Sequence, residues 1–183
     1  MRGDFVTRLA AADIGATFNQ YAASPLLQGR LRTYLSTRAA AEVVLVGEAA
    51  GYRGARVSGI PFTSERQLTG SGPAEATATI VHRVLAKLGI WDEVLLWNVV
   101  PTHPGTETSN RRPTRKEVEA ASPFLHELAC GRTAIPIGRL AAATLQAPYI
   151  RHPSHGGAAE FEAGLRRAFA TIGRRRAAVR LFL

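Results

Sequence analysis

The sequence predicts an α/β fold, in the form of a single-domain three-layer α/β/α sandwich with a central, mainly parallel four-stranded sheet. Short apolar runs alternate along the chain with longer stretches of helical periodicity. This alternation favours a parallel sheet that carries helices on both faces. No internal repeat and no Pro/Gly/Ser-rich linker divides the 183 residues, so we expect one domain over residues 1–183.

The apolar runs and the helix signals predict the elements in order. Strands are expected at 41–46, 93–100, 133–137 and 149–151. The first forty residues are expected to be helical, with apolar anchors at Leu9, Phe18, Tyr21, Leu31 and Leu35. Later helices are expected at 73–88, 114–128, 139–146 and 158–169, followed by an arginine-rich tail that ends as a strand or a helix. Pro73 suits a first helical position, and Thr114 with Glu117 suits a capping box.

The charge of the chain favours a polyanionic partner. The 23 basic residues exceed the 14 acidic residues, which gives a net charge of +9. Lys87 and Lys116 are the only lysines, so the excess is carried by arginine, which contacts phosphates in bidentate fashion and stacks on bases. Nucleic acid is one interpretation. An arginine-rich surface without a particular ligand is the other.

Cysteine and hydropathy exclude several classes of protein. Cys130 is the only cysteine, so the chain has neither an internal disulfide nor a four-cysteine metal site. The histidines show no metal-ligand spacing, and we expect no metal and no other cofactor. Residues 1–7 lack the apolar region of a signal peptide, and no later segment has the length of a membrane span. We therefore expect a soluble protein of the cytoplasm.

Three polar segments follow the predicted strands. They are residues 47–62, 98–110 and 152–157. Ligands of open parallel sheets bind at the carboxyl ends of the strands, because the loops that follow the strands meet there. The sequence therefore predicts a single site formed by these three segments.

Asn98 is the most informative polar residue of these segments. It interrupts the apolar run of residues 94–100, where a buried carboxamide must find partners. A carboxamide can donate to one group and accept from its neighbour, which matches O4 and N3–H of uracil and mismatches cytosine at both points. The alternative is a structural asparagine that closes a turn.

The other candidates are weaker when each is taken alone. The small residues of 47–51 would let the backbone approach a ligand, which suits a base, a nucleotide or a methyl donor, but also an ordinary strand-to-helix turn. Phe62 could present a flat ring to a base or belong to the core. His152 ends a predicted strand before Pro153 and Ser154, where it could donate a hydrogen bond to developing negative charge or have a structural role.

Five segments carry a resemblance to a known family. The chain has GEAAG at 47–51, GIPF at 59–62, WNVVPTHPG at 97–105, NRRPT at 110–114 and HPS at 152–154. In this order and spacing they resemble the uracil-DNA glycosylase superfamily, most closely its bacterial and archaeal family four. The segment IPIGRLAAATL at 135–145 also resembles the family, and the resemblance covers roughly residues 41–170. It implies a monomeric DNA-repair enzyme that hydrolyses the N-glycosidic bond of flipped-out uracil.

The resemblance implies a role for each matching position. Phe62 would stack on the uracil, Asn98 would read its Watson–Crick edge, and His152 would face O2 as a catalytic residue. Glu48 matches a glutamate implicated in catalysis, and the backbone amides around Ala49 would approach the base. DNA would be contacted by residues outside the base pocket, namely Ser64, Ser71, Asn110, Arg111, Ser154 and His155.

The chain also departs from the family pattern. The four cysteines that hold an iron–sulfur cluster in family four are missing, so no cluster is expected. Ala49 stands where the best-known family has a water-activating aspartate, and Ala50 replaces the proline of the motif. The segment after HPS is His155-Gly156-Gly157, which leaves the DNA-intercalating residue unassigned.

Three rival functions remain open from the sequence. The same fold could act on hypoxanthine, xanthine or a mismatched base. The apolar strand that runs into the glycines of 47–51 also suits a methyltransferase, although the following strand ends in Asn98 rather than in an acidic residue. The third rival is a non-catalytic DNA-damage binder, or a protein that traps the abasic sugar covalently through a histidine.

Overall fold

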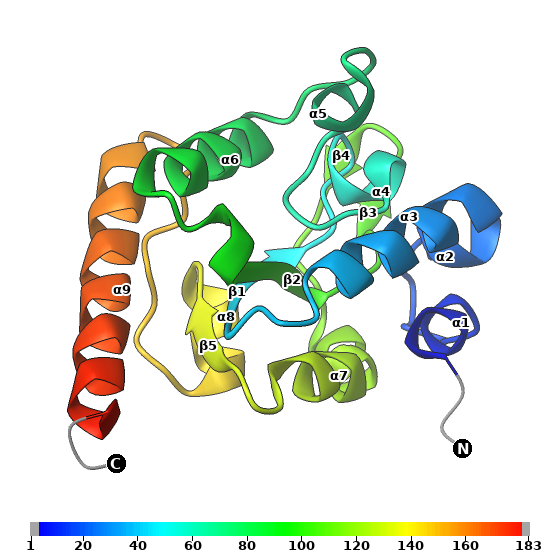
Figure 1. Ribbon diagram of the computed structural model, residues 1–183. Helices are drawn as coiled ribbons and strands as arrows, with labels where there is room; N and C mark the ends of the chain where they lie inside the picture. The colour runs from blue at the N-terminus through cyan, green and yellow to red at the C-terminus, as the bar shows by residue number, and fades with distance from the viewer. Residues whose placement is uncertain (1–3, 181–183) are drawn as a thin grey trace.

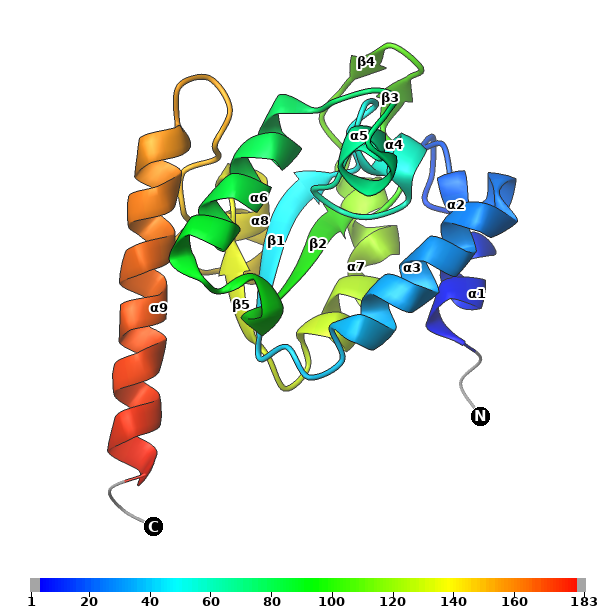
Figure 2. The ribbon, with the colours of Figure 1, turned by 45° about the horizontal axis from the view of Figure 1, so that its top comes forward.

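The computed structural model describes residues 4–180, with side chains described from Asp4 to Arg174. Three parallel strands form the central sheet in the order β2-β1-β5, and they are β1 (Val43–Ala49), β2 (Val94–Val100) and β5 (Thr133–Pro136). Helices α7 (Arg115–Ala129) and α8 (Arg139–Leu145) contact one face of the sheet. Helices α3 (Pro25–Thr37) and α6 (Ala76–Leu88) lie over the other face, and α9 (Ala158–Arg180) runs beside the β5 edge (Figure 1, Figure 2). The predicted α/β sandwich with a parallel sheet is confirmed.

The predicted fourth strand is reduced to a single bridge. Ile150 pairs in parallel with Ile137, where the Ile150 amide donates to the Pro136 carbonyl and the Gly138 amide donates to the Ile150 carbonyl, each at 2.9 Å. Pro148 and Pro153 flank this position. Proline has no backbone N–H to donate, so pairing cannot extend far in either direction. The bridge still places the following residues at the carboxyl end of the sheet.

The core is formed where the sheet is covered on both faces. All seven residues of β2 are buried, as are the first five of β1. Continuous apolar runs of this kind are typical of strands that have helices on both sides. Gly47 of β1 pairs directly with Asn98 of β2, so the two residues lie side by side in the sheet. This register brings two of the sequence motifs together.

The N-terminal region consists of three helices rather than one continuous helical stretch. Helices α1 (Phe5–Ala10), α2 (Gln20–Ala23) and α3 begin after Asp4, Asn19 and Ser24, whose side chains accept hydrogen bonds from the first-turn amides. Leu9, Tyr21 and Leu31 are fully buried anchors, as predicted.

Phe18 was predicted as an apolar anchor, and this is wrong. Its side chain is 42% exposed, and the Arg56 guanidinium lies 4.8 Å from the centre of the ring. Phe18 lies between α1 and α2, where its backbone pairs with His103. It therefore does not belong to the buried face of a helix.

The later helices begin and end mostly where the sequence indicates. The capping box of Thr114 and Glu117 is present at the start of α7. Helix α6 begins at Ala76 after Glu75 instead of at Pro73, because the Pro73 carbonyl accepts from the Arg66 amide of the preceding turn. Helix α9 continues to Arg180, beyond the predicted end at residue 169, through alanine and arginine residues that favour helix. The last three residues of the predicted tail lie outside the described residues.

Short elements surround the carboxyl ends of the strands. They are α4 (Ala55–Ser58), α5 (Glu65–Thr69) and a hairpin of β3 (Gly105–Thr106) and β4 (Ser109–Asn110), whereas the 3₁₀ helix η1 (Trp91–Glu93) directly precedes β2 at the opposite edge of the sheet. The hairpin and the two short helices were not predicted. Within residues 4–180, no helix combines the length and the apolarity that a bilayer span requires.

Candidate active site

A cavity of about 550 Å³ opens at the carboxyl ends of the strands. The ends of β1 and β2, the loop after β5, the β3–β4 hairpin and the segment after Ile150 all contribute residues to its lining. The predicted site residues that line the cavity are Glu48, Ala49, Phe62, Asn98, Asn110, Arg111, His152, Ser154 and His155. The expectation that the loops after the strands meet in one place is therefore fulfilled.

Gly47 supports the Phe62 ring and the Asn98 carboxamide. A Cβ atom at Gly47 would overlap the edge of the Phe62 ring and would lie 2.8 Å from Asn98 Oδ1. Asn98 is 3% exposed and its carboxamide has no hydrogen-bond partner among the described residues. Phe62 has a φ of +53°, which a non-glycine residue adopts only at a cost. A flat ring and an unpaired carboxamide therefore meet at the same point of the cavity.

His152 lines the cavity and has its Nδ1 nitrogen engaged by Ser154. The Ser154 backbone amide donates to Nδ1 at 3.2 Å, and Ser154 Oγ lies 2.8 Å from the same nitrogen. Because a backbone N–H can only donate, Nδ1 carries no proton, and the proton of the neutral ring is on Nε2. Burial lowers the pKa of His152, and the nearby charges of His155 and Arg151 lower it further. The ring is therefore a neutral imidazole with a donor at Nε2.

Two carboxyl groups line the cavity. Burial raises the pKa of Glu48, and the charge of Arg112 opposes that rise. Glu75, which precedes α6, also lines the cavity, and burial raises the pKa of its carboxyl group. The Glu75 carboxylate packs against Gly51 and Gly54, where added Cβ atoms would collide with it. Glu75 was not predicted from the sequence. It immediately precedes α6, and no local pattern shows that its side chain packs against the loop at Gly51 and Gly54, more than twenty positions earlier.

The β3–β4 hairpin forms one wall of the cavity. Asn110 Oδ1 accepts a hydrogen bond of 2.9 Å from the Tyr52 amide, so the hairpin is fastened to the loop after β1. Arg111 forms a bidentate ion pair with Glu117, with distances of 2.6 and 2.8 Å. This ion pair lowers the pKa of Glu117 to about 2. Two residues predicted to contact DNA thus also hold the wall in place.

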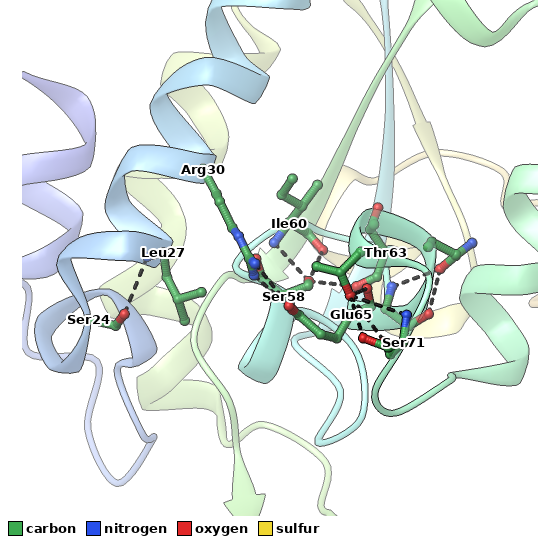
Figure 3. Close-up of polar contacts among 11 residues, drawn as sticks. Ser24, Leu27, Arg30, Ser58, Ile60, Thr63, Glu65 and Ser71 are labelled. Carbon is green, nitrogen blue, oxygen red and sulfur yellow. Dashed lines mark hydrogen bonds and ion pairs between the residues drawn. The ribbon is translucent and has the colours of Figure 1, made fainter.

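The Phe62 loop rests on a buried polar network. Ser58 Oγ donates to the Thr63 carbonyl at 2.6 Å, and Arg30 pairs with Glu65 at 2.7 Å (Figure 3). Thr63 Oγ1 lies 3.0 Å from His82 Nε2, and burial lowers the pKa of His82 to about 4. His82 therefore supports the loop as a neutral ring, a role that its position in a helix did not indicate.

Ser64 and Ser71, which were predicted to contact DNA, do not line the cavity. Ser64 is fully buried, and both its amide and its hydroxyl donate to Gln67 Oε1 at 2.8 Å in the capping box of α5. Its hydroxyl is therefore not available at the surface. Ser71 is exposed and lies in the segment between α5 and α6, where its hydroxyl oxygen is 3.3 Å from Thr69 Oγ1 (Figure 3).

Unpaired arginines surround the mouth of the cavity. Arg112, Arg139 and Arg151 line it, and among the described residues their guanidinium groups form no ion pair and no hydrogen bond. Several arginines elsewhere form ion pairs, for example Arg8 with Glu127 and Arg38 with Asp92. Sequence reasoning found the excess of arginine but not its location. No group of three or more potential metal ligands occurs among the described residues.

Comparison with known proteins agrees with this geometry. A model of the uracil DNA glycosylase superfamily matches residues 36–175. Among solved structures, the crystal structure of wild-type SMUG2 from Pedobacter heparinus is similar, with a TM-score of 0.67 and 11% sequence identity over 93% of this chain and 98% of that chain. This likeness shows a shared fold. A search of curated proteins finds no match.

The match to the superfamily model covers most of the chain, including every motif from residue 47 to residue 154. The enzymes of this superfamily are DNA glycosylases, hydrolases that act on damaged bases in DNA. The chain therefore belongs to the uracil DNA glycosylase superfamily.

Proposed function

We propose that the chain is a uracil-DNA glycosylase that hydrolyses the N-glycosidic bond of flipped-out uracil and leaves an abasic site. A base inside a duplex is inaccessible, so the nucleotide must rotate into the cavity. The observation that carries the proposal is that Phe62, Asn98, His152 and Glu48 line one cavity of about 550 Å³. As part of the same proposal, the enzyme acts as a monomer in the cytoplasm, at the nucleoid.

Recognition of the base rests on Phe62 and Asn98. The ring offers a flat surface for stacking, and its edge lies close to the carboxamide over Gly47. The Asn98 carboxamide has no partner among the described residues, so its donor and its acceptor are free for O4 and N3–H of uracil. Cytosine would leave both groups unpaired in a buried position, which is the basis for its rejection.

Bond cleavage rests on His152 and on the backbone around Ala49. When the glycosidic bond breaks, its electron pair goes to N1 of uracil and negative charge spreads to O2. The Nε2–H of neutral His152 can donate to that oxygen, and one donor of this kind is worth about 3–4 kcal/mol in the transition state. Water then adds at C1′ and loses a proton, for which the Glu48 carboxylate is the acceptor that we assign.

The DNA backbone is held by the arginines at the mouth of the cavity. Arg112, Arg139 and Arg151 line the cavity without ion-pair partners among the described residues. Guanidinium groups bind phosphates in bidentate geometry and release counterions as they do so. Ser154 and His155 lie at the same mouth and are assigned to the same strand.

A second substrate class is favoured by Glu75. Uracil has a single N–H group on its Watson–Crick edge, and Asn98 already accepts it in this scheme. The Glu75 carboxylate is an additional acceptor in the cavity, with no hydrogen bond to the described residues. Hypoxanthine in a nucleotide also has a single ring N–H group, whereas xanthine has two, at N1 and N3, so a deaminated purine of the xanthine type is the second candidate.

An excision assay tests both candidates. Oligonucleotides that contain uracil, hypoxanthine, xanthine or thymine are incubated with the protein, and abasic sites are cleaved by alkali. We expect uracil to be released, and Asn98→Ala to slow its release by roughly a hundredfold or more. Gln146→Asn, which changes an exposed carboxamide at the C-terminal end of α8 outside the cavity lining, is the control. Release of uracil by Asn98→Ala at the parental rate would overturn the assignment of Asn98.

The Glu75→Gln variant separates the two substrates. If Glu75 accepts from a purine, the variant loses xanthine release and keeps uracil release. Release of hypoxanthine or xanthine without release of uracil by the parent protein would replace the first candidate with the second. No release of any base would remove both.

A further inference from the structure

His103 is buried next to the cavity and takes no part in the proposed chemistry. It is 0% exposed, and it follows β2 in the segment Pro101–Pro104. Its backbone is fixed by a bridge to Phe18, in which the Phe18 amide donates to the His103 carbonyl at 2.9 Å and the His103 amide donates to the Phe18 carbonyl at 3.0 Å. The ring therefore has little freedom to turn away from its neighbours.

Both ring nitrogens of His103 face backbone carbonyl groups. Nδ1 lies 2.7 Å from the Ala50 oxygen, and Nε2 lies 2.7 Å from the Thr106 oxygen. A carbonyl oxygen can only accept. A neutral imidazole has one N–H group, so one of these short contacts would join two lone pairs with no proton between them. Only an imidazolium, with an N–H at each nitrogen, makes both contacts favourable.

From this geometry we propose that His103 is held as an imidazolium and acts as a positioning residue for the cavity wall. Its two N–H groups join Ala50, in the loop after β1, to Thr106, in the β3–β4 hairpin. Ala50 lines the cavity, and the hairpin supplies Asn110 to it. The same two segments are also joined by the bond from the Tyr52 amide to Asn110. Loss of His103 would remove two of the hydrogen bonds that hold the hairpin against the loop after β1, and would leave the Tyr52–Asn110 bond and the Arg56–Glu107 ion pair nearby.

Charged side chains lie on the segments around His103, among them Asp13 before the Phe18 bridge, yet none of the described ones pairs with the ring. Glu48 is on β1, Glu107 follows β3, and Arg56 on α4 forms an ion pair of 3.0 Å with Glu107. On the hairpin side, Arg111 is occupied by Glu117. The charge of the ring is therefore stabilised by the two carbonyl dipoles rather than by a carboxylate.

Nitrogen NMR of the full-length protein tests the protonation state directly. The protein is labelled with ¹⁵N-histidine, and the His103 signals are identified by their loss in His103→Asn. At pH 7.5 we expect both ring nitrogens of His103 to show the chemical shift of protonated nitrogen and to carry slowly exchanging protons. A single unprotonated nitrogen at His103 would overturn the proposal. This measurement uses the parent protein and does not depend on its substrate.

Single-turnover kinetics test the positioning role, and this arm rests on the proposed function. Displacement of the wall by about 1 Å can cost roughly a hundredfold in rate, so we expect His103→Leu to lower the rate of uracil release by roughly ten- to a hundredfold. His103→Gln keeps an N–H donor and should recover part of the loss. His126→Leu, at an exposed histidine of α7, is the matched control. Equal rates for the parent and a folded His103→Leu would overturn the positioning role.

The two arms fail in different ways. A parent protein that releases no uracil contradicts the proposed function. The NMR measurement still tests the protonation state of His103, because it needs no substrate. If His103→Leu does not fold, the rate of His103→Gln relative to the parent replaces it, and an unchanged rate in that variant counts against the positioning role.

Discussion

The molecule has two hollows whose difference is informative. The cavity at the carboxyl ends of the strands measures about 550 Å³, and the groove between β5 and α9 measures about 1130 Å³. The larger hollow is lined by residues such as Pro148, Ile150, Ala168 and Ile172. The smaller one contains the unpaired Asn98 carboxamide, a neutral histidine and two carboxyl groups whose pKa values are raised by burial. The unpaired polar groups, rather than the volume, are the reason why we propose the smaller hollow as the reaction site.

The two hollows also differ in how they are built. The cavity is formed by loops that are tied to one another, as in the bond from the Tyr52 amide to Asn110. The groove is left open where the pairing of the β5 edge stops at the single bridge of Ile150 and where α9 stands beside the sheet (Figure 2). Its lining combines apolar residues with charged ones such as Glu42, Glu160 and Arg167, and it includes no residue of the five sequence motifs.

The sharpest test of this difference adds one methyl group to each hollow. In Gly47→Ala the new Cβ would overlap the Phe62 ring and approach Asn98 Oδ1 to 2.8 Å, so we expect a loss of at least about a hundredfold in the rate of base release. In Gly164→Ala the new Cβ would lie 2.7 Å from Ile150 Cγ2 in the groove. That variant should lose stability in urea denaturation and keep its rate. Loss of activity in Gly164→Ala without loss of stability would reverse the comparison.

The next effect is a dependence of the rate on pH. The pKa of His152 lies below its ordinary value of 6.5, so the ring stays neutral at pH 7 and gains its proton only as the pH falls below that value. A proton on Nδ1 would oppose the Ser154 amide that now donates to it and would displace the ring. We therefore expect a flat rate above pH 6.5 and a decline on the acid side, measured by single-turnover release of uracil. In His152→Ala the remaining slow rate should lack that part of the decline, whereas an unchanged profile would exclude His152 as its origin.

The smallest expected effect concerns salt. Each phosphate contact contributes about 0.9 to the slope of log affinity against log salt. If Arg139 and Arg151 each bind one phosphate, replacing both with alanine should reduce that slope by about 2. Arg167→Ala, in the groove, is the matched control and should leave the slope unchanged. Fluorescence anisotropy with a duplex oligonucleotide at several salt concentrations measures it. Equal slopes for the double variant and the parent would remove these arginines from the DNA surface.

Most of the fold, and the residues at the strand ends that line the cavity, could be predicted from the sequence. Apolar runs predicted three strands because residues 43–46 and 94–100 face helices on both sides, and the capping box at Thr114 predicted the start of α7. The strand at 149–151 is reduced to one bridge because only four residues lie between Pro148 and Pro153, which have no backbone N–H to donate. Five motifs in register predicted many of the residues that line the cavity, and four of these motifs lie at or directly after the end of a strand or bridge, whereas GIPF at 59–62 follows α4.

The walls of the site could not be predicted in the same way. Glu75 reaches the cavity from the start of α6, and His103 reaches Ala50 and Thr106 from the end of β2. These contacts depend on side-chain direction and on the relative placement of segments distant in sequence. Ser64 failed for the opposite reason, because a serine at a helix start can be used up by its own cap.

Two residues at the cavity have left-handed backbones, Phe62 with φ +53° and His155 with φ +51°. A glycine at either position would relieve roughly 1 kcal/mol of strain. Thermostabilisation by consensus or by directed evolution would therefore be drawn to His155 first, and would exchange a side chain at the DNA-facing mouth for a higher melting temperature. If His155 contacts DNA as proposed, the strained backbone at this position lowers thermal stability in favour of DNA binding.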